Sequence, residues 1–178
     1  MAGRYRRSYR STWIALLALA LIVGFRLLRE RSAPEPPEAI QEGIYRVQRV
    51  VDGDTLLLEN NARVRLIGVD TPETVKPDHP VEPWGPEATA FTRDFLDGGE
   101  VALRFDRERV DRYGRFLAFA YVGERMLNEE LLRAGLARAN LQYRYADTIK
   151  RQFRRAEDEA KAARRGIWSS GQSGKKAA

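Results

Sequence analysis

The sequence predicts an α+β domain in which five short strands close into a small β-barrel and three helices pack beside it. The strand predictions rest on β-branched and leucine-rich runs and on apolar alternation, which are typical of half-buried strands. These runs lie at residues 44–51, 55–59, 62–68, 100–105 and 115–122. Asn60-Asn61 lies between the second and third runs and predicts a tight hairpin turn. With a two-residue turn, residue 54 pairs near residue 67.

The three helices are predicted from apolar spacing and from residues that favour helix ends. Residues 86–96 begin with proline in the first turn, and residues 128–134 end before Gly135. From 147 to about 165, apolar side chains recur at helical spacing and charges occupy the other faces. Gly166 stands where a helix C-terminus favours glycine.

The chain is basic, which fits a polyanionic partner. Lysine and arginine total 31 against 25 aspartate and glutamate, for a formal charge of +6 and a pI near 9.8. Such a balance suits nucleic acid, although part of the excess lies in the two terminal segments, where solubility or membrane topology also explains it. Five short strands in a basic protein favour an oligonucleotide-binding (OB) barrel.

The absence of cysteine and the scarcity of histidine exclude several kinds of site. There is no cysteine and one histidine, so disulfides, thiolate metal sites and paired-histidine zinc sites are excluded. The one histidine, His79, lies in a proline-rich run, which favours an exposed loop.

The N-terminal part of the chain predicts membrane attachment. A basic tail at 1–10 precedes an apolar run at 11–28, which approaches the length of a transmembrane or signal-anchor helix. Charged residues follow the run directly, which favours a single-pass anchor over a signal peptide cleaved before secretion. A slight charge bias places the following domain outside the cytoplasm. A linker rich in proline and glutamate at 29–42, a folded domain at 43–169 and a disordered tail at 170–178 complete the prediction.

Two acidic clusters carry the candidate chemistry. Asp52 and Asp54 stand two apart before a strand, so an extended backbone there directs both carboxylates to one side. A divalent cation such as Ca²⁺ accepts carboxylate and carbonyl oxygens and offsets the repulsion of paired acids. The second cluster, Asp70-Thr71-Pro72-Glu73, follows the strand that contains Arg65. Each cluster alone is also compatible with ordinary turn chemistry.

A later turn, Asp111-Arg112-Tyr113-Gly114-Arg115, delivers a second guanidinium at the start of the last strand. Phosphodiester cleavage passes through a highly charged state that two arginines and a metal ion stabilise, while a carboxylate activates water. Carboxylates and arginines that converge on one site therefore favour phosphodiester chemistry.

Taken together, these blocks resemble the staphylococcal nuclease (thermonuclease) family. The matching blocks occur in the family's order and cover essentially all of residues 43–169. They are Val51-Asp52-Gly53-Asp54-Thr55, Arg65-Leu66-Ile67-Gly68-Val69-Asp70-Thr71-Pro72-Glu73-Thr74, Trp84-Gly85-Pro86-Glu87-Ala88 and Asp111-Arg112-Tyr113-Gly114-Arg115.

The resemblance implies an OB-barrel with three helices and a Ca²⁺-dependent hydrolase that cuts DNA and RNA with little sequence preference, leaving 3′-phosphate ends. It also implies the roles of individual residues. It implies that Asp54, Asp70 and the carbonyl of Thr71 bind Ca²⁺, with Asp52 as an outer-sphere acid. Glu73 is expected to activate the attacking water, and Arg65 and Arg115 are expected to bind the phosphate. The expected substrate contacts are Arg112, Tyr113 and Tyr143.

One departure from the family concerns the aromatic contacts. The family has two tyrosines beside the nucleotide, whereas this sequence has Leu141 and then Tyr143, so one contact is missing or is supplied by Tyr145. The alternative function is a catalytically inactive module of the same fold that binds nucleic acid or peptide. A monomer without a protein partner is expected.

Overall fold

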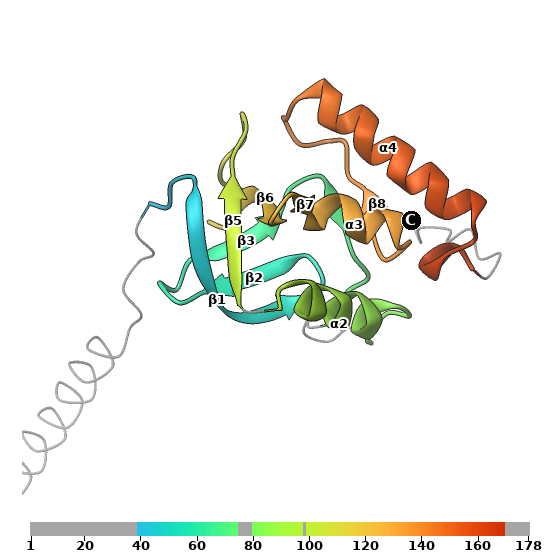
Figure 1. The fold of residues 1–178 in the computed structure, drawn as a ribbon, viewed down its shortest axis with the longest axis horizontal. Helices are drawn as coiled ribbons and strands as arrows, with labels where there is room; N and C mark the ends of the chain where they lie inside the picture. Colours follow the sequence, from blue (N-terminus) through green and yellow to red (C-terminus); the bar gives the residue numbers. More distant parts are fainter. Residues whose placement is uncertain (1–38, 75–79, 98, 170–178) are drawn as a thin grey trace, which may run out of the picture. The chain divides into compact units, whose positions relative to one another are not determined.

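The structure is a computed structural model that describes residues 39–74, 80–97 and 99–169. Five of its strands form a closed barrel, and Figure 1 shows the helices that accompany it. The barrel strands are β1 (Gly43–Asp52), β2 (Thr55–Leu58), β3 (Arg63–Leu66), β5 (Glu100–Arg104) and β6 (Phe116–Val122). They follow the order β3-β2-β1-β5-β6, and β3 also pairs with β6 in parallel, which closes the barrel. The prediction of an OB-type barrel is confirmed.

Three shorter strands were not predicted. β7 (Arg125–Met126) extends the barrel sheet from β6, and β4 (Val69–Asp70) pairs with β8 (Arg138–Ala139) in a separate two-stranded sheet. Strands of two residues carry too short a pattern to be recognised by alternation. The β4–β8 pair nevertheless matters, because it places Asp70 opposite Arg138.

The register of the β2–β3 hairpin differs by one residue from the prediction. Thr55 pairs with Arg65, and the N–H of Leu58 donates to the carbonyl of Ala62 at 2.9 Å. The loop therefore has three residues, 59–61, and Asn61 adopts a left-handed φ of 63°. Three-residue hairpin loops commonly contain one such residue, and asparagine tolerates that conformation. Asp54 thus lies opposite Leu66, whose N–H donates to the Asp54 carbonyl at 2.8 Å.

The three predicted helices are confirmed. They are α2 (Gly85–Phe95), α3 (Leu127–Arg133) and α4 (Asp147–Ala162), and a short 3₁₀ helix, η1 (Gly166–Trp168), follows. α4 ends three residues earlier than predicted, because Arg164 and Gly166 both have positive φ. At Gly166 a side chain would collide with the Gly135 carbonyl, and the N–H of Ile167 donates to that carbonyl at 2.9 Å. Glycine therefore permits the loops that follow α3 and α4 to touch.

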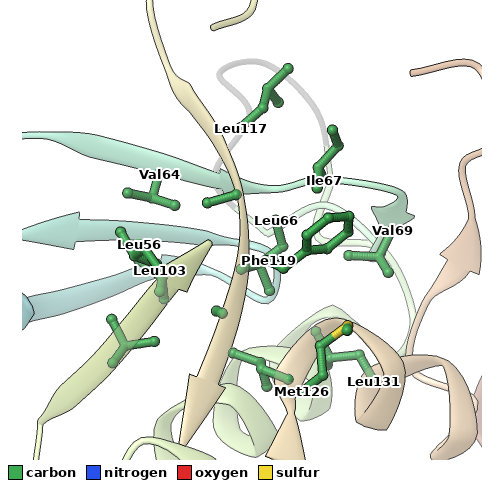
Figure 2. Close-up of a cluster of buried hydrophobic side chains, with 14 of the residues drawn as sticks. Leu56, Val64, Leu66, Ile67, Val69, Leu103, Leu117, Phe119, Met126 and Leu131 are labelled. Carbon is green, nitrogen blue, oxygen red and sulfur yellow. The ribbon is translucent and has the colours of Figure 1, made fainter. Parts of the chain in front are cut away.

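The core joins the barrel to the helices (Figure 2). Leu56, Val64 and Leu117 come from barrel strands, and Leu131 comes from α3. Phe119 in β6 also packs edge-on against Tyr145 and Phe153, with ring centroids 5.9 and 6.1 Å away. Burial of these side chains is the main favourable contribution to folding.

One buried polar residue, Asn128 in α3, is satisfied by backbone groups from two other segments. Its side chain is fully buried; its amide nitrogen donates to the Ile67 carbonyl at 2.9 Å, and its oxygen accepts from the Ala120 N–H at 3.0 Å. Asn128 therefore fixes α3 against β6 and against the segment that leads from β3 to Asp70.

The N-terminal helix predicted at 11–28, the tail at 1–10, most of the linker and the tail at 170–178 lie outside the described residues. All the described residues belong to one compact unit, Pro37–Ala178. Within the described ranges, no helix is long and apolar enough to cross a bilayer.

We expect Asn128→Ala to lower the free energy of unfolding by about 3 kcal/mol, because two buried backbone groups lose their partner. Urea denaturation followed by circular dichroism measures the change. Asn60→Ala, in the exposed hairpin loop, is the control and should cost about 1 kcal/mol or less. Equal losses in the two variants would show that Asn128 does not join the elements in this way.

Candidate functional site

A pocket of about 410 Å³ gathers most of the predicted site residues. It is lined by Val51, Asp52, Asp54, Thr55, Arg63, Arg65, Asp70, Thr71, Glu73, Arg115, Asn140 and Tyr143. These residues come from the end of β1, the start of β2 and the turn between them, from β3, from β4 and the segment after it, from the position before β6, and from the segment that follows β8. The predicted catalytic, metal-binding and outer-acid residues all line the pocket, and Tyr143 lines it too.

The two acids of the first cluster are separated by a turn: Asp52 ends a strand and Asp54 lies in the turn that follows. β1 ends at Asp52 and β2 begins at Thr55, so the chain turns between the two carboxylates. Asp52 accepts hydrogen bonds from the Thr74 hydroxyl at 2.7 Å and from the Gly53 N–H at 2.8 Å. Asp54 instead accepts from the Thr71 N–H at 2.9 Å. The extended backbone on which the predicted alignment depended is therefore not present at residues 53–54, although both side chains reach the pocket.

Arg65 lies between two carboxylates. One guanidinium nitrogen forms an ion pair with Asp54, and the other donates to Asp70 at 2.8 Å. Arg65 and Asp54 are buried, whereas the Asp70 side chain is 59% exposed. Burial raises the pKa of Asp54; the Arg65 charge and the Thr71 N–H oppose that shift, while Asp70 and Asp52 add to it. The surroundings of Asp54 thus favour additional positive charge.

Arg115 is held by a turn that ends in the pocket. Its Nε donates to Asp111 at 2.7 Å, and its backbone N–H donates to the same carboxylate at 3.0 Å. Burial opposes ionisation of Asp111, but the hydrogen bonds from Arg115 and from the Tyr113 N–H outweigh it and hold the pKa of Asp111 below its usual range. Asp111 was not predicted as a site residue. Its position four residues before Arg115 in a turn could have indicated that the two side chains form an ion pair.

Glu73 is fixed at its backbone by a residue from beyond the undescribed segment 75–79. Its N–H donates to a Glu82 carboxylate oxygen at 3.2 Å, and its carbonyl accepts from the Glu82 N–H at 2.9 Å. The Glu73 side chain lines the pocket. The two backbone contacts therefore hold residue 73 at the pocket's edge.

The predicted substrate contacts divide into two groups. Tyr143 lines the pocket, whereas Arg112 and Tyr113 do not. Arg112 donates to the Tyr113 hydroxyl at 2.7 Å, and the Arg115 guanidinium lies 5.4 Å from the exposed Tyr113 ring. Arg112 and Tyr113 therefore sit beside Arg115, outside the pocket.

Tyr145 does not supply the second aromatic contact. Its side chain is almost fully buried in the core, and its hydroxyl donates to the Asn140 carbonyl at 3.1 Å. Burial raises the pKa of Tyr145 to about 12. The suggestion that Tyr145 replaces the missing tyrosine is therefore wrong.

Three polar pocket residues were not predicted as site residues: Thr55, Arg63 and Asn140. Arg63 stands two residues before Arg65 on β3, and strand alternation places both on one face, so this contact was predictable. Asn140 follows β8 and reaches the pocket through tertiary packing, for which the sequence carries no local signal.

The oxygen atoms of the pocket fit a hard divalent cation. Asp54 and Asp70 supply carboxylates, and Ca²⁺ prefers carboxylate, carbonyl and water oxygens. The Thr71 hydroxyl is buried beside them and has no hydrogen-bond partner among the residues that the structure describes. Across those residues, no three acid or histidine side chains lie close enough to hold an ion alone, so backbone and water oxygens would complete the coordination.

Helix α2 supports the acidic turn from behind. The fully buried Thr92 hydroxyl donates to the Gly53 carbonyl at 2.6 Å. A side chain at Gly53 would lie 2.8 Å from the Ala88 Cβ and 2.8 Å from the Thr71 hydroxyl, so glycine permits this close packing. α2 therefore sets the position from which Asp54 enters the pocket.

We expect Thr92→Val to lower the free energy of unfolding by about 2 kcal/mol, because it removes a buried donor from the Gly53 carbonyl and keeps the methyl group. Thr92→Ser retains the hydroxyl and should lose less. Urea denaturation compares the two. A larger loss in the serine variant would mean that methyl packing, not the hydrogen bond, holds the turn.

Comparison with known proteins places the chain in a family. The family model described as staphylococcal nuclease homologue matches residues 63–170. A thermonuclease from Staphylococcus hyicus is 38% identical over 88% of this chain and 95% of its own length. A thermonuclease from Staphylococcus intermedius is 39% identical over 89% of this chain and 96% of its own length. Endonuclease YncB from Bacillus subtilis is 38% identical over 79% of this chain and 69% of its own length. The chain therefore belongs to the staphylococcal nuclease family.

Proposed function

We propose that the protein is a Ca²⁺-dependent nuclease that hydrolyses phosphodiester bonds in DNA and RNA. The observation that carries this proposal is the convergence of Arg65 and Arg115 with Asp54, Asp70 and Glu73 around one pocket. Guanidinium groups recognise phosphate oxygens, and oxygen donors recognise the cation that such chemistry uses. The relatives named thermonuclease and endonuclease support the same reaction class.

Each residue of the pocket has its own role in the proposed reaction. Arg115, already oriented by Asp111, presents its remaining nitrogens toward a phosphate in the pocket. Arg65 stabilises the charge that develops on the phosphate oxygens. Glu73, at the pocket's edge, orients and deprotonates the attacking water. The bond from phosphorus to the 5′ oxygen then breaks, which leaves a 3′-phosphate and a 5′-hydroxyl.

Asp54, Asp70 and the Thr71 carbonyl would hold the cation, and Asp52 would act on it from outside the coordination sphere. When bound, the ion supplies a Lewis acid that polarises the phosphate. Because Arg65 contacts both acids, a cation at Asp54 would also release one guanidinium nitrogen toward substrate.

Low sequence preference follows from the composition of the pocket. Its cationic residues address phosphate, and phosphate contacts carry no base information. Tyr143 is the aromatic residue that lines the pocket within the described part of the chain, so base stacking is limited.

The alternative of an inactive binding module is disfavoured. Such a module has no need for acids beside the phosphate-binding arginines, yet all the predicted catalytic and metal-binding residues line this pocket. Membrane anchoring by residues 11–28, an extracytoplasmic nuclease domain and a monomeric state stay proposals that rest on the sequence.

We expect the 178-residue chain to release acid-soluble nucleotides from single-stranded DNA with Ca²⁺ and not with a chelator. Glu73→Gln and Arg115→Ala should each lower the rate by about 100-fold or more, as loss of a general base or of a charge-stabilising group does. Arg93→Gln, on the exposed surface of α2, is the control and should cleave normally. DNA binding without cleavage under Ca²⁺, Mg²⁺ or Mn²⁺ would support the inactive module instead.

A further inference from the structure

Helix α4 carries like charges at spacings that local helix energetics disfavours. Lys150 and Arg154 stand four residues apart, as do Arg151 and Arg155, so like charges are neighbours on the helix surface. Like-charge pairs at this spacing destabilise a helix, and positive charge near a helix N-terminus also opposes its dipole. Residues that break local rules without a structural benefit are expected where function requires them.

The cations around α4 fall into two groups. Arg133, Arg155 and Lys161 each form ion pairs with carboxylates of α3 or α4. Arg144, Lys150 and Arg154 have no ion pair with any residue in the described part of the chain, and we call these three the α4 basic surface. Arg151, Arg164 and Arg165 form no ion pair there either, but Arg151 lines a separate pocket beside Glu129 and Glu159.

Three acids near this surface accept hydrogen bonds from backbone groups. Glu108 accepts from the Arg144 backbone N–H at 2.9 Å, and Asp106 accepts from the Ala146 N–H at 2.7 Å. Glu157 accepts from the Ala139 N–H at 2.9 Å and pairs with Lys161. The exposed Asp147 begins the helix. Within the described residues, none of these acids forms an ion pair with a cation of the α4 basic surface, whose side chains are therefore available to an anion.

The surface adjoins the pocket. Arg144 follows Tyr143, which lines the pocket. The Tyr145 hydroxyl contacts Asn140, another lining residue, and the Lys150 ammonium lies 5.1 Å from the centre of the Tyr145 ring. The charge of Arg154 also acts on Tyr145, where it opposes the rise in the pKa of the hydroxyl. A nucleic-acid strand that leaves the pocket past Tyr143 would meet these cations next.

We propose that the α4 basic surface binds phosphates of a single-stranded nucleic acid as it leaves the pocket, and so favours long substrates over short ones. The inference rests on the proposed nuclease function and adds a polymer-binding site to it. Side chains four residues apart on a helix lie about 5–6 Å apart, so Lys150 and Arg154 can follow successive phosphates of an extended strand. Such contacts increase affinity and carry no sequence preference.

The test compares the 178-residue chain with two variants of equal charge. The first carries Arg144→Gln, Lys150→Gln and Arg154→Gln; the control carries Arg46→Gln, Arg93→Gln and Arg125→Gln, three exposed positions that do not line the pocket. Fluorescence anisotropy with chelator present measures binding to a labelled oligonucleotide of about 16 nucleotides over a range of KCl concentrations.

Three lost phosphate contacts should reduce the slope of log affinity against log salt concentration by about 2 in the first variant. The control should keep the slope of the unmodified chain. With Ca²⁺, kcat/KM for a dinucleotide should be unchanged in the first variant, while KM for the oligonucleotide rises.

Other results would overturn the proposal in distinguishable ways. An unchanged slope in the first variant would show that the surface does not bind the strand. An equal fall on the dinucleotide would show that the substitutions damage the pocket. If the first variant instead loses binding to phosphatidylserine vesicles and keeps the salt slope, the surface faces a membrane. If the unmodified chain cleaves neither substrate, the nuclease function itself fails, and the inference fails with it.

Discussion

The burial of a carboxylate, Asp54, at the mouth of the barrel is the constraint on which the site depends. A buried charge is costly unless it is paired and hydrogen-bonded. Here Arg65 supplies the pairing charge and the Thr71 N–H supplies a hydrogen bond. The arrangement therefore requires the β2–β3 hairpin and the segment after β4 to meet at one point, while α2 fixes the turn that carries Asp54.

The same constraint explains why phosphate chemistry suits this place. Arg65 is shared by two acids, so a cation that binds those acids leaves part of the guanidinium available to an anion. Arg115 is held by Asp111 and lines the same pocket. One arginine is thus coupled to the proposed metal site and the other is independent of it. Farther out, the cations of α4 extend positive charge along the path that a polymer would follow.

Much of the fold was predictable because its elements obey simple periodicities. β-Branched, leucine-rich and aromatic-rich runs, with alternation at 100–105, identified the five barrel strands, and the 3.6-residue repeat identified α4 through Phe153 and Ala156. The hairpin register was not predictable from pattern alone, because it depends on whether Asn61 adopts a positive φ. A one-residue error followed, and it misplaced the partner of Asp54.

The site residues were predictable where sequence motifs mark them. The prediction failed where tertiary packing decides which side chains reach the pocket. Arg65, Asp70 and Glu73 lie close in sequence, and the structure places them on one pocket. Tyr145 looked equivalent to Tyr143 in sequence, yet core packing against Phe119 and Phe153 buries it. Nothing local marks Asn140 as a pocket residue. Which cations of α4 lack a partner likewise depends on the position of acids such as Glu159.

The most direct test of the central claim is to measure unfolding by urea at increasing Ca²⁺ concentration, for the unmodified chain and for Asp54→Asn. A ligand that binds only the folded state stabilises it by about 2.7 kcal/mol at 100 times its Kd. We expect the unmodified chain to gain stability in this saturable way and Asp54→Asn to gain none. Equal gains in both proteins, or no gain in either, would contradict a cation site built on Asp54.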